Sequence, residues 1–146
     1  MSRGNSVREV DLFNSPLETG VRTLLILNAA HPMAFDLSQL TWLDHLVVHT
    51  GDIGGPESLH PDLPHRTGEL LVRRSTIEQG LVLMRRLCLI DIVASHQGIL
   101  YRACEEAYPL AQLMKSTYAK SLKARATWLA EHVCTLDASA FKTLVT

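Results

Sequence analysis

The sequence predicts a mainly α-helical protein with a small β-hairpin, organised as a winged helix-turn-helix with additional C-terminal helices. Apolar residues recur at helical spacing in three segments before a pair of short β-rich runs, and in further segments after it. Three helices followed by a hairpin are typical of a winged helix-turn-helix, with the third helix in the recognition position and the hairpin as the wing. With 146 residues, 47% hydrophobic, and a formal net charge of -1, the composition fits one globular domain and excludes disordered, collagenous and disulfide-framework classes.

Capping signals mark the first two helices. The capping box at 15–18 places Pro16 at the first helical position, so a helix should begin there and end before the His31-Pro32 pair. Apolar residues off its main stripe predict burial on more than one side. A second capping signal at 36–39 opens a helix that should run to about Thr50.

A Gly/Pro-rich segment separates these helices from the third. Residues 50–68 show no periodicity, which predicts a long ordered surface loop rather than a linker. A short strand at 69–72 could follow. The capping box at 75–78 then predicts a helix of about three turns. Gly80 should lie on its buried side, where another backbone can approach closely.

The second half begins with a predicted hairpin. Runs of β-branched and apolar residues at 89–93 and 99–102 flank a turn in which Gly98 should have positive φ. The later segments predict, in order, a short helix near Tyr108, a long helix from about Thr117 to Val133, and an amphipathic piece at 136–145.

Three parts of the chain follow from this pattern. We expect a flexible N-terminal tail at 1–14, a winged-helix-like domain at 15–134 that includes the Gly/Pro loop at 50–68, and a C-terminal amphipathic segment at 135–146.

The small net charge conceals an asymmetry. Residues 1–72 carry four basic and nine acidic side chains, whereas residues 73–146 carry ten basic and six acidic ones. Four arginines around the predicted recognition helix could contact phosphates: Arg73, Arg74, Arg85 and Arg86. Glu78 and Val82 stand on that helix where a base-reading protein usually carries Arg, Asn or Gln. Protein binding is therefore favoured over specific DNA reading, and weak or indirect DNA contact stays open.

The histidines are the strongest candidates for metal ligands in this sequence. Five of the seven lie within 31–65 among several carboxylates, a density of ligand types that could hold a metal. His45 and His49 are one helical turn apart, but the residues between them lack the glutamate of a metalloprotease helix. We favour structural histidines, and we expect no metal and no other cofactor.

Asp44 falls inside the apolar stripe of the second helix. A carboxylate there needs a partner, because burying it alone is very costly. Arg66, Arg73 or a backbone amide of the following loop could supply one. No second acid or base stands beside Asp44, so a structural role is favoured over a catalytic one. We likewise expect Gly54 and Gly55 to be structural.

Trp42 and Trp128 lie opposite the core stripes of their helices, with His45 and His49 alongside Trp42. Aromatic side chains off the main core either fill a second layer or meet a partner, and both readings stay open. The chain has no nucleophile elbow, and Gly54-Gly55-Pro56 lacks the Lys-Ser/Thr ending of a phosphate loop. The sequence therefore predicts that the protein is not an enzyme.

The three cysteines have no paired short spacing, and the N-terminal residues contain no apolar segment of signal or membrane length. This pattern predicts a cytoplasmic protein with no membrane association, whose thiols act as small core hydrophobes.

Several stretches carry a resemblance to a known family. They are 14–20, 42–52, Gly54-Gly55-Pro56, Ser58-Leu59-His60-Pro61, and 66–74 leading to 80–84. Over most of 14–133 this pattern resembles the middle component of bacterial ABC-three-component systems. The Gly-Gly-Pro and Ser-Leu-His-Pro loop is its specific part.

The resemblance implies a non-catalytic adaptor of a Lamassu-type defence system, encoded with an SMC/Rad50-like coiled-coil ATPase and an effector, often a nuclease. We expect partner binding through the off-core aromatics and the ordered loop, at Trp42, His45, His49, Leu59, His60 and Trp128. The alternative is a DNA-binding winged-helix regulator, and a metal-dependent enzyme stands third.

Overall fold

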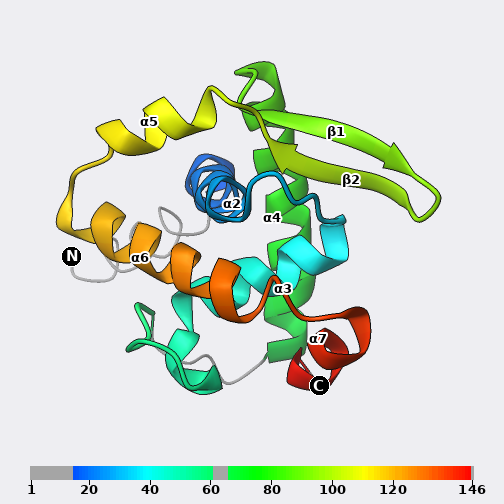
Figure 1. The fold of residues 1–146 in the computed structure, drawn as a ribbon, viewed down its shortest axis with the longest axis vertical. Helices are drawn as coiled ribbons and strands as arrows, with labels where there is room; N and C mark the ends of the chain where they lie inside the picture. The colour runs from blue at the N-terminus through cyan, green and yellow to red at the C-terminus, as the bar shows by residue number, and fades with distance from the viewer. Residues whose placement is uncertain (1–14, 61–65, 146) are drawn as a thin grey trace, which may run out of the picture.

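The computed structural model describes residues 15–60 and 66–145, apart from the side chains of 66–71, 138 and 145 (Figure 1). The described residues form a mainly helical domain with one antiparallel hairpin, which confirms the predicted fold class. In chain order the elements are α2 (Pro16–Ala30), α3 (Leu37–Val48), the 3-10 helix η1 (Thr50–Ile53), α4 (Arg66–Arg86), β1 (Ile90–Ser95), β2 (Gly98–Ala103), α5 (Ala107–Leu113), α6 (Thr117–His132) and α7 (Ala138–Val145).

The predicted starts of α2 and α3 are confirmed. The hydroxyl of Ser15 accepts a hydrogen bond from the Glu18 amide at 3.2 Å, and Pro16 occupies the first turn. Asp36 accepts from the Gln39 amide at 2.7 Å, while the Gln39 side chain accepts from the Asp36 amide at 2.9 Å. This reciprocal pair is a complete capping box.

The predicted start of the third helix is wrong. Helix α4 begins at Arg66, so Ser75 lies inside the helix and the expected strand at 69–72 is helical instead. The neighbouring Thr76 hydroxyl donates to the Val72 carbonyl at 3.0 Å. Within a helix, the hydroxyl of Ser or Thr can donate its hydrogen bond to the carbonyl four residues earlier. A capping pattern therefore does not by itself locate a helix start.

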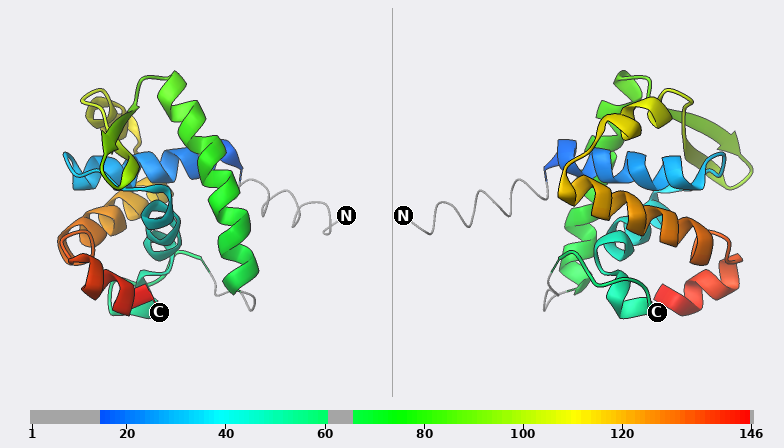
Figure 2. Two further views of the ribbon diagram at one scale, coloured as in Figure 1. Left: turned by 90° about the vertical axis from the view of Figure 1, so that its right-hand side faces the viewer. Right: turned by 60° about the vertical axis from the view of Figure 1, so that its left-hand side comes forward.

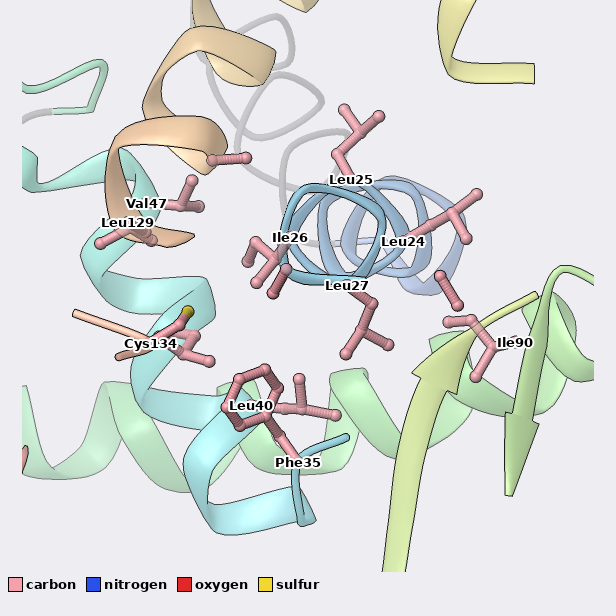
Figure 3. Packing of buried hydrophobic residues seen from close by; sticks show 14 of the residues in the cluster. Leu24, Leu25, Ile26, Leu27, Phe35, Leu40, Val47, Ile90, Leu129 and Cys134 are labelled. Atoms are coloured by element: carbon pink, nitrogen blue, oxygen red, sulfur yellow. The ribbon is translucent and has the colours of Figure 1, made fainter. Parts of the chain in front are cut away.

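Helix α2 lies at the centre of the domain. It contacts α4 on one side and α6 on another, with α3, α5 and β2 completing its surroundings (Figures 1 and 2). Four consecutive residues, Leu24 to Leu27, are at most 2% exposed and point in different directions around the helix (Figure 3). This arrangement confirms the prediction that the helix is buried on more than one side.

Two glycines let α2 and α4 meet at the backbone. A Cβ at Gly80 would lie 2.7 Å from the Gly20 amide nitrogen and 2.8 Å from the Pro16 carbonyl oxygen. Backbone atoms cannot yield as a flexible side chain can, so only glycine fits there. The close approach predicted for Gly80 is confirmed.

The hairpin pairs Ile90 with Ala103 through to Ser95 with Gly98, and Gly98 has the predicted positive φ, 109°. Phe35, between α2 and α3, joins the free side of β2: its amide donates to the Tyr101 carbonyl at 2.9 Å and its carbonyl accepts from the Tyr101 amide at 2.8 Å. The hairpin is thereby fastened to the α2–α3 connection. Element order and this bridge are consistent with a winged helix.

The C-terminal helices confirm the predicted segments. Helix α6 buries Ala119, Leu122, Ala126 and Leu129 on one face, and Ser116 caps its start by accepting from the Ala119 amide at 3.1 Å. In α7, Phe141 and Leu144 are partly buried against the core.

Cys88 ends α4 in the left-handed conformation, with φ 60°. Its amide donates to the Arg85 carbonyl, and the Leu89 amide donates to the Met84 carbonyl, both at 3.0 Å. These two bonds form a Schellman motif, whose left-handed position favours glycine. Cys134 is buried, as expected of a core thiol, but Cys88 is exposed, so the expectation of a core position was wrong for Cys88.

Replacing Cys88 with glycine should stabilise the protein by about 1 kcal/mol, because glycine adopts positive φ without the Cβ clash. Urea unfolding would measure the gain. Cys88→Ser is the matched control: it removes the thiol, keeps the strained backbone, and should give no comparable gain. Equal effects of the two substitutions would show that the backbone conformation is not the cause.

Candidate functional site

A buried ion-pair cluster holds three helices together around Asp44. The Asp44 side chain is fully buried, and Arg22 of α2 donates to its Oδ1 from Nε at 3.0 Å and to its Oδ2 from Nη2 at 3.3 Å. Arg73 of α4 donates to Oδ2 from Nη1 at 2.5 Å. Of the partners predicted for Asp44, Arg73 is confirmed. Arg22 was missed, because nothing in the sequence distinguishes it from a surface arginine.

The charges within the cluster stabilise one another. Burial opposes ionisation of Asp44, but the two guanidiniums outweigh it and lower the pKa of this carboxyl below its usual range. Burial also opposes the charge of Arg22, yet Asp44 raises the pKa of the guanidinium above its usual value. Both groups are therefore charged at neutral pH, and Arg22 makes a further bond to the Thr19 hydroxyl at 3.2 Å.

His60 and Tyr118 lie over this cluster. His60 Nε2 and the Tyr118 hydroxyl are hydrogen-bonded at 2.8 Å, and the two rings stack with their planes 16° apart. Burial lowers the pKa of His60 to about 4, and the positive charges of Arg22 and Arg73 add to this effect. Burial likewise raises the pKa of Tyr118. The pair is therefore neutral at pH 7.

Hydrogen bonds to the end of α3 and within the loop itself fix the position of residues 50–60, which we name the clamped loop. The amides of Leu59 and His60 both donate to the Val48 carbonyl, at 3.0 and 3.1 Å. The Thr50 hydroxyl donates to the Pro56 carbonyl at 2.7 Å, and the Gly55 amide donates to the Thr50 carbonyl at 2.9 Å. Of the Gly/Pro loop predicted at 50–68, residues 50–53 form η1 and α4 already begins at Arg66, so the predicted end of the loop was wrong; residues 61–65 lie outside the described part of the chain.

Side chains of helix α6 bind and cover the clamped loop. Arg125 donates to the Glu57 carbonyl twice, from Nε at 2.8 Å and from Nη2 at 2.6 Å. The Trp128 ring covers Gly55, where a Cβ would lie within 2.8 to 2.9 Å of the indole. Gly54 has φ 79°, in the left-handed region that favours glycine. Both loop glycines therefore have structural roles, one conformational and one steric.

A family model described as ABC-three component (ABC-3C) system Middle Component 2 matches residues 12–146. The chain belongs to this family. No curated protein and no solved structure matches it. The protein is thus an accessory middle component of an ABC-three-component defence system, in which it works with the other components of that system.

In this middle component, the predicted partner-binding residues do not form one exposed surface. His45 and His49 are 4% and 2% exposed and lie against each other, with ring centroids 4.4 Å apart. Their expected placement opposite the core was wrong, because α3 is buried around most of its circumference between α2, α4 and α6. Trp42 is half-buried and meets His45 edge-on, at 6.2 Å between centroids.

Trp128 and Leu59 both contact the rest of the domain. Trp128 is half-buried between the clamped loop and His132, with which it stacks at a centroid separation of 4.6 Å. This contact fits the second-layer reading of Trp128. Leu59 is also partly buried against the core, so its side chain anchors the clamped loop.

The arginines proposed for nucleic-acid contact separate into two groups. Arg73 is 8% exposed and bound to Asp44, so its proposed role at a phosphate was wrong. Arg74 is exposed and donates to the Ser38 hydroxyl at 2.9 Å. Arg85 and Arg86 are exposed in the last turn of α4.

Within the described residues, no group of three or more His, Cys, Asp or Glu side chains is arranged to hold a metal ion. In the same part of the chain, no helix is long and apolar enough to span a membrane.

Asp44→Asn should lower the free energy of unfolding by about 3–5 kcal/mol, because it leaves two buried guanidiniums without their counter-ion. Urea unfolding of the variant would measure this loss. Glu105→Gln, at an exposed position before α5, is the control for loss of a surface carboxylate and should change stability by less than about 0.5 kcal/mol. A similarly small loss for Asp44→Asn would contradict a dependence of the fold on the ion pair.

His60 should make stability fall as the solution is acidified. The unfolded chain takes up a proton at this histidine near pH 6.5, whereas the folded protein resists protonation until about pH 4. The contribution is therefore complete above pH 6.5 and is lost progressively as the pH falls toward 4. His60→Gln keeps hydrogen-bonding capacity but cannot be protonated, so it should flatten the pH dependence of the thermal midpoint in this interval.

His96→Gln provides the control for this experiment, because His96 is exposed in the hairpin turn. It should leave the pH dependence unchanged. The assignment fails if the two variants show the same dependence as the wild-type protein. Any contribution from Asp44 is separate, because its pKa is lowered and its stabilisation is lost only in more acidic solution.

Proposed function

We propose that the protein is the non-catalytic adaptor of a cytoplasmic, Lamassu-type ABC-three-component system. It docks the SMC/Rad50-like coiled-coil ATPase and restrains the effector, often a nuclease, until invading DNA is sensed. Membership of the middle-component family supports an accessory role, and the finer assignment extends the resemblance carried by the loop motif at 54–61.

The clamped loop is the observation that carries this proposal. Its backbone is held by the end of α3, and α6 fixes it from the side through Arg125 and Trp128. A surface fixed before binding loses little conformational entropy when a partner arrives, which favours affinity. Such an arrangement suits a docking surface better than a spacer.

The exposed side chains of the clamped loop define the chemistry of its partner. Asp52 and Glu57 are exposed, while the carbonyl of Glu57 stays bound to Arg125. An acidic docking surface favours a basic patch on the ATPase through electrostatic complementarity. The exposed arginines Arg85 and Arg86 lie in the last turn of α4. That end of α4 leads into the hairpin, whereas η1 lies at the other end of the molecule (Figure 1).

A second candidate function, a DNA-binding winged-helix regulator, is favoured by the Phe35–Tyr101 bridge and by the exposed Arg74, Arg85 and Arg86. These arginines could contact phosphates and so support weak or indirect DNA contact. Against this function, the exposed side of α4 also carries Glu78 and Val82, which suit neither phosphate nor base contacts. We therefore prefer the adaptor.

Reversing the charges of the clamped loop with Asp52→Lys and Glu57→Lys should weaken co-purification with the ATPase of the same system by about tenfold or more. Both side chains are exposed, so the domain should remain folded. Glu105→Lys with Glu106→Lys is the matched control: it reverses two exposed acidic residues beside α5 and should leave co-purification intact.

Undiminished co-purification after the loop reversal would rule out docking through the clamped loop, and an undiminished result with Trp42→Ala as well would exclude both predicted docking positions. The DNA-binding alternative has a different signature. It requires salt-dependent retention of duplex DNA by the protein alone, lost when Arg74, Arg85 and Arg86 are changed to alanine. The same three changes do not alter the clamped loop, so each chain should still bind the ATPase through that loop.

A further inference from the structure

Helix α4 presents a long exposed face on one edge of the molecule. Its 21 residues span about 31 Å, and the helix runs along the side of the domain (Figure 2). Its inner side is buried through Arg73, Ile77, Gly80, Leu81 and Met84. On the outer side, Val72 is 65% exposed and Val82 45%, and Leu87, just beyond the helix, is 60% exposed.

The outer residues of α4 are spaced as in helices that pair with another helix. Exposed side chains recur at intervals of three, four, three and four residues: Val72, Ser75, Gln79, Val82 and Arg86. This spacing is the heptad pattern of a helix seam, with apolar and polar positions mixed. Glu78 and Arg85 flank the seam on one side, and Thr76 and Leu83 flank it on the other.

The charged residues beside the seam, Glu78 and Arg85, are complementary to the same residues of a second copy that runs antiparallel. A two-fold axis that pairs antiparallel helices brings the same flank of each helix together. Since Glu78 and Arg85 lie seven residues apart on one flank, such an axis places each Glu78 opposite Arg85 of the other copy. The same register sets Thr76 against Leu83 and Val72 against Leu87.

We propose that α4 is a homodimer interface, in which the face formed by Val72, Ser75, Gln79, Val82 and Arg86 packs antiparallel against the same face of a second copy. The pairing covers the exposed valines and joins Glu78 to Arg85 twice. Duplex DNA would leave the valines without apolar contacts and would bring Glu78 against phosphates. A second copy offers apolar contacts to the valines and an opposite charge to Glu78 and Arg85. It would also cover the helix that a winged-helix protein presents to DNA.

The size of this interface sets its strength. Two helices of this length, joined along one mixed seam, bury less than the roughly 1,600 Å² of a standard stable interface. The dimer should therefore be reversible, with the single chain prevailing in dilute solution and the pair at high concentration. Sedimentation equilibrium of the isolated full-length protein over a wide concentration range would measure the dissociation constant.

Charge reversals test the register directly. Glu78→Arg sets arginine against Arg85, and Arg85→Glu sets glutamate against Glu78, so each variant alone should dimerise at least about tenfold more weakly than the wild type. The double variant should regain the dimer. An equimolar mixture of the two single variants should form a heterodimer, because both cross-pairs become opposite in charge.

Glu131→Arg and Lys120→Glu, at exposed positions of α6, are the control reversals and should dimerise like the wild type. A wild-type protein that remains a single chain at the highest concentration overturns the proposal, as does a single reversal that leaves the dimer intact. If the protein is monomeric alone and the α4 reversals instead abolish ATPase binding, the face belongs to the ATPase and not to a second copy. Because the dimer is measured on the protein alone, its failure is distinguishable from failure of the adaptor function.

Discussion

The carboxylate of Asp44 is the group on which the arrangement of α2, α3 and α4 depends. It is carried by α3, it is fully buried, and it is bound by one arginine from α2 and another from α4. Removing Asp44 would leave two buried guanidiniums without a counter-ion, and removing either arginine would leave Asp44 with only one of its two, so the cluster is complete only when the three helices assemble together. The Gly20–Gly80 contact strengthens this requirement, because it brings the α2 and α4 backbones close enough for both guanidiniums to reach one carboxylate.

The same cluster connects the core to the candidate docking surface. His60 is the last residue of the clamped loop, and its ring is hydrogen-bonded to Tyr118 of α6, near Arg22. Burial opposes a charge on either ring, and the nearby guanidiniums further oppose a positive charge on His60, so its imidazole is neutral. The loop therefore takes its position from the helices beneath it, and α6 then fixes its outer part through Arg125.

The two proposed interfaces use different parts of the molecule. The clamped loop carries exposed acidic side chains and is held by hydrogen bonds, whereas the exposed face of α4 mixes apolar and polar residues along one helix and is flanked by Glu78 and Arg85. An adaptor that pairs through α4 would carry two copies of the clamped loop in one assembly. Binding by both copies to a partner that offers two matching sites would then raise the effective affinity without any new contact.

Local sequence determined what depends on local interactions. The helix starts predicted at Ser15 and Asp36 are confirmed, as is the hairpin predicted around Gly98. Helix caps and tight turns form their hydrogen bonds within a few residues, so local sequence is enough to predict them. Membership of the middle-component family is likewise a property of the sequence, because the family model matches residues 12–146. Only the tertiary structure decided the start of α4, where the Ser75 capping pattern lies within a longer helix, and the burial of His45, His49 and Arg73. Those outcomes depend on which elements surround a residue: Arg22 and Arg73 are indistinguishable from surface arginines along the chain, and they become buried partners only once α2, α3 and α4 enclose Asp44.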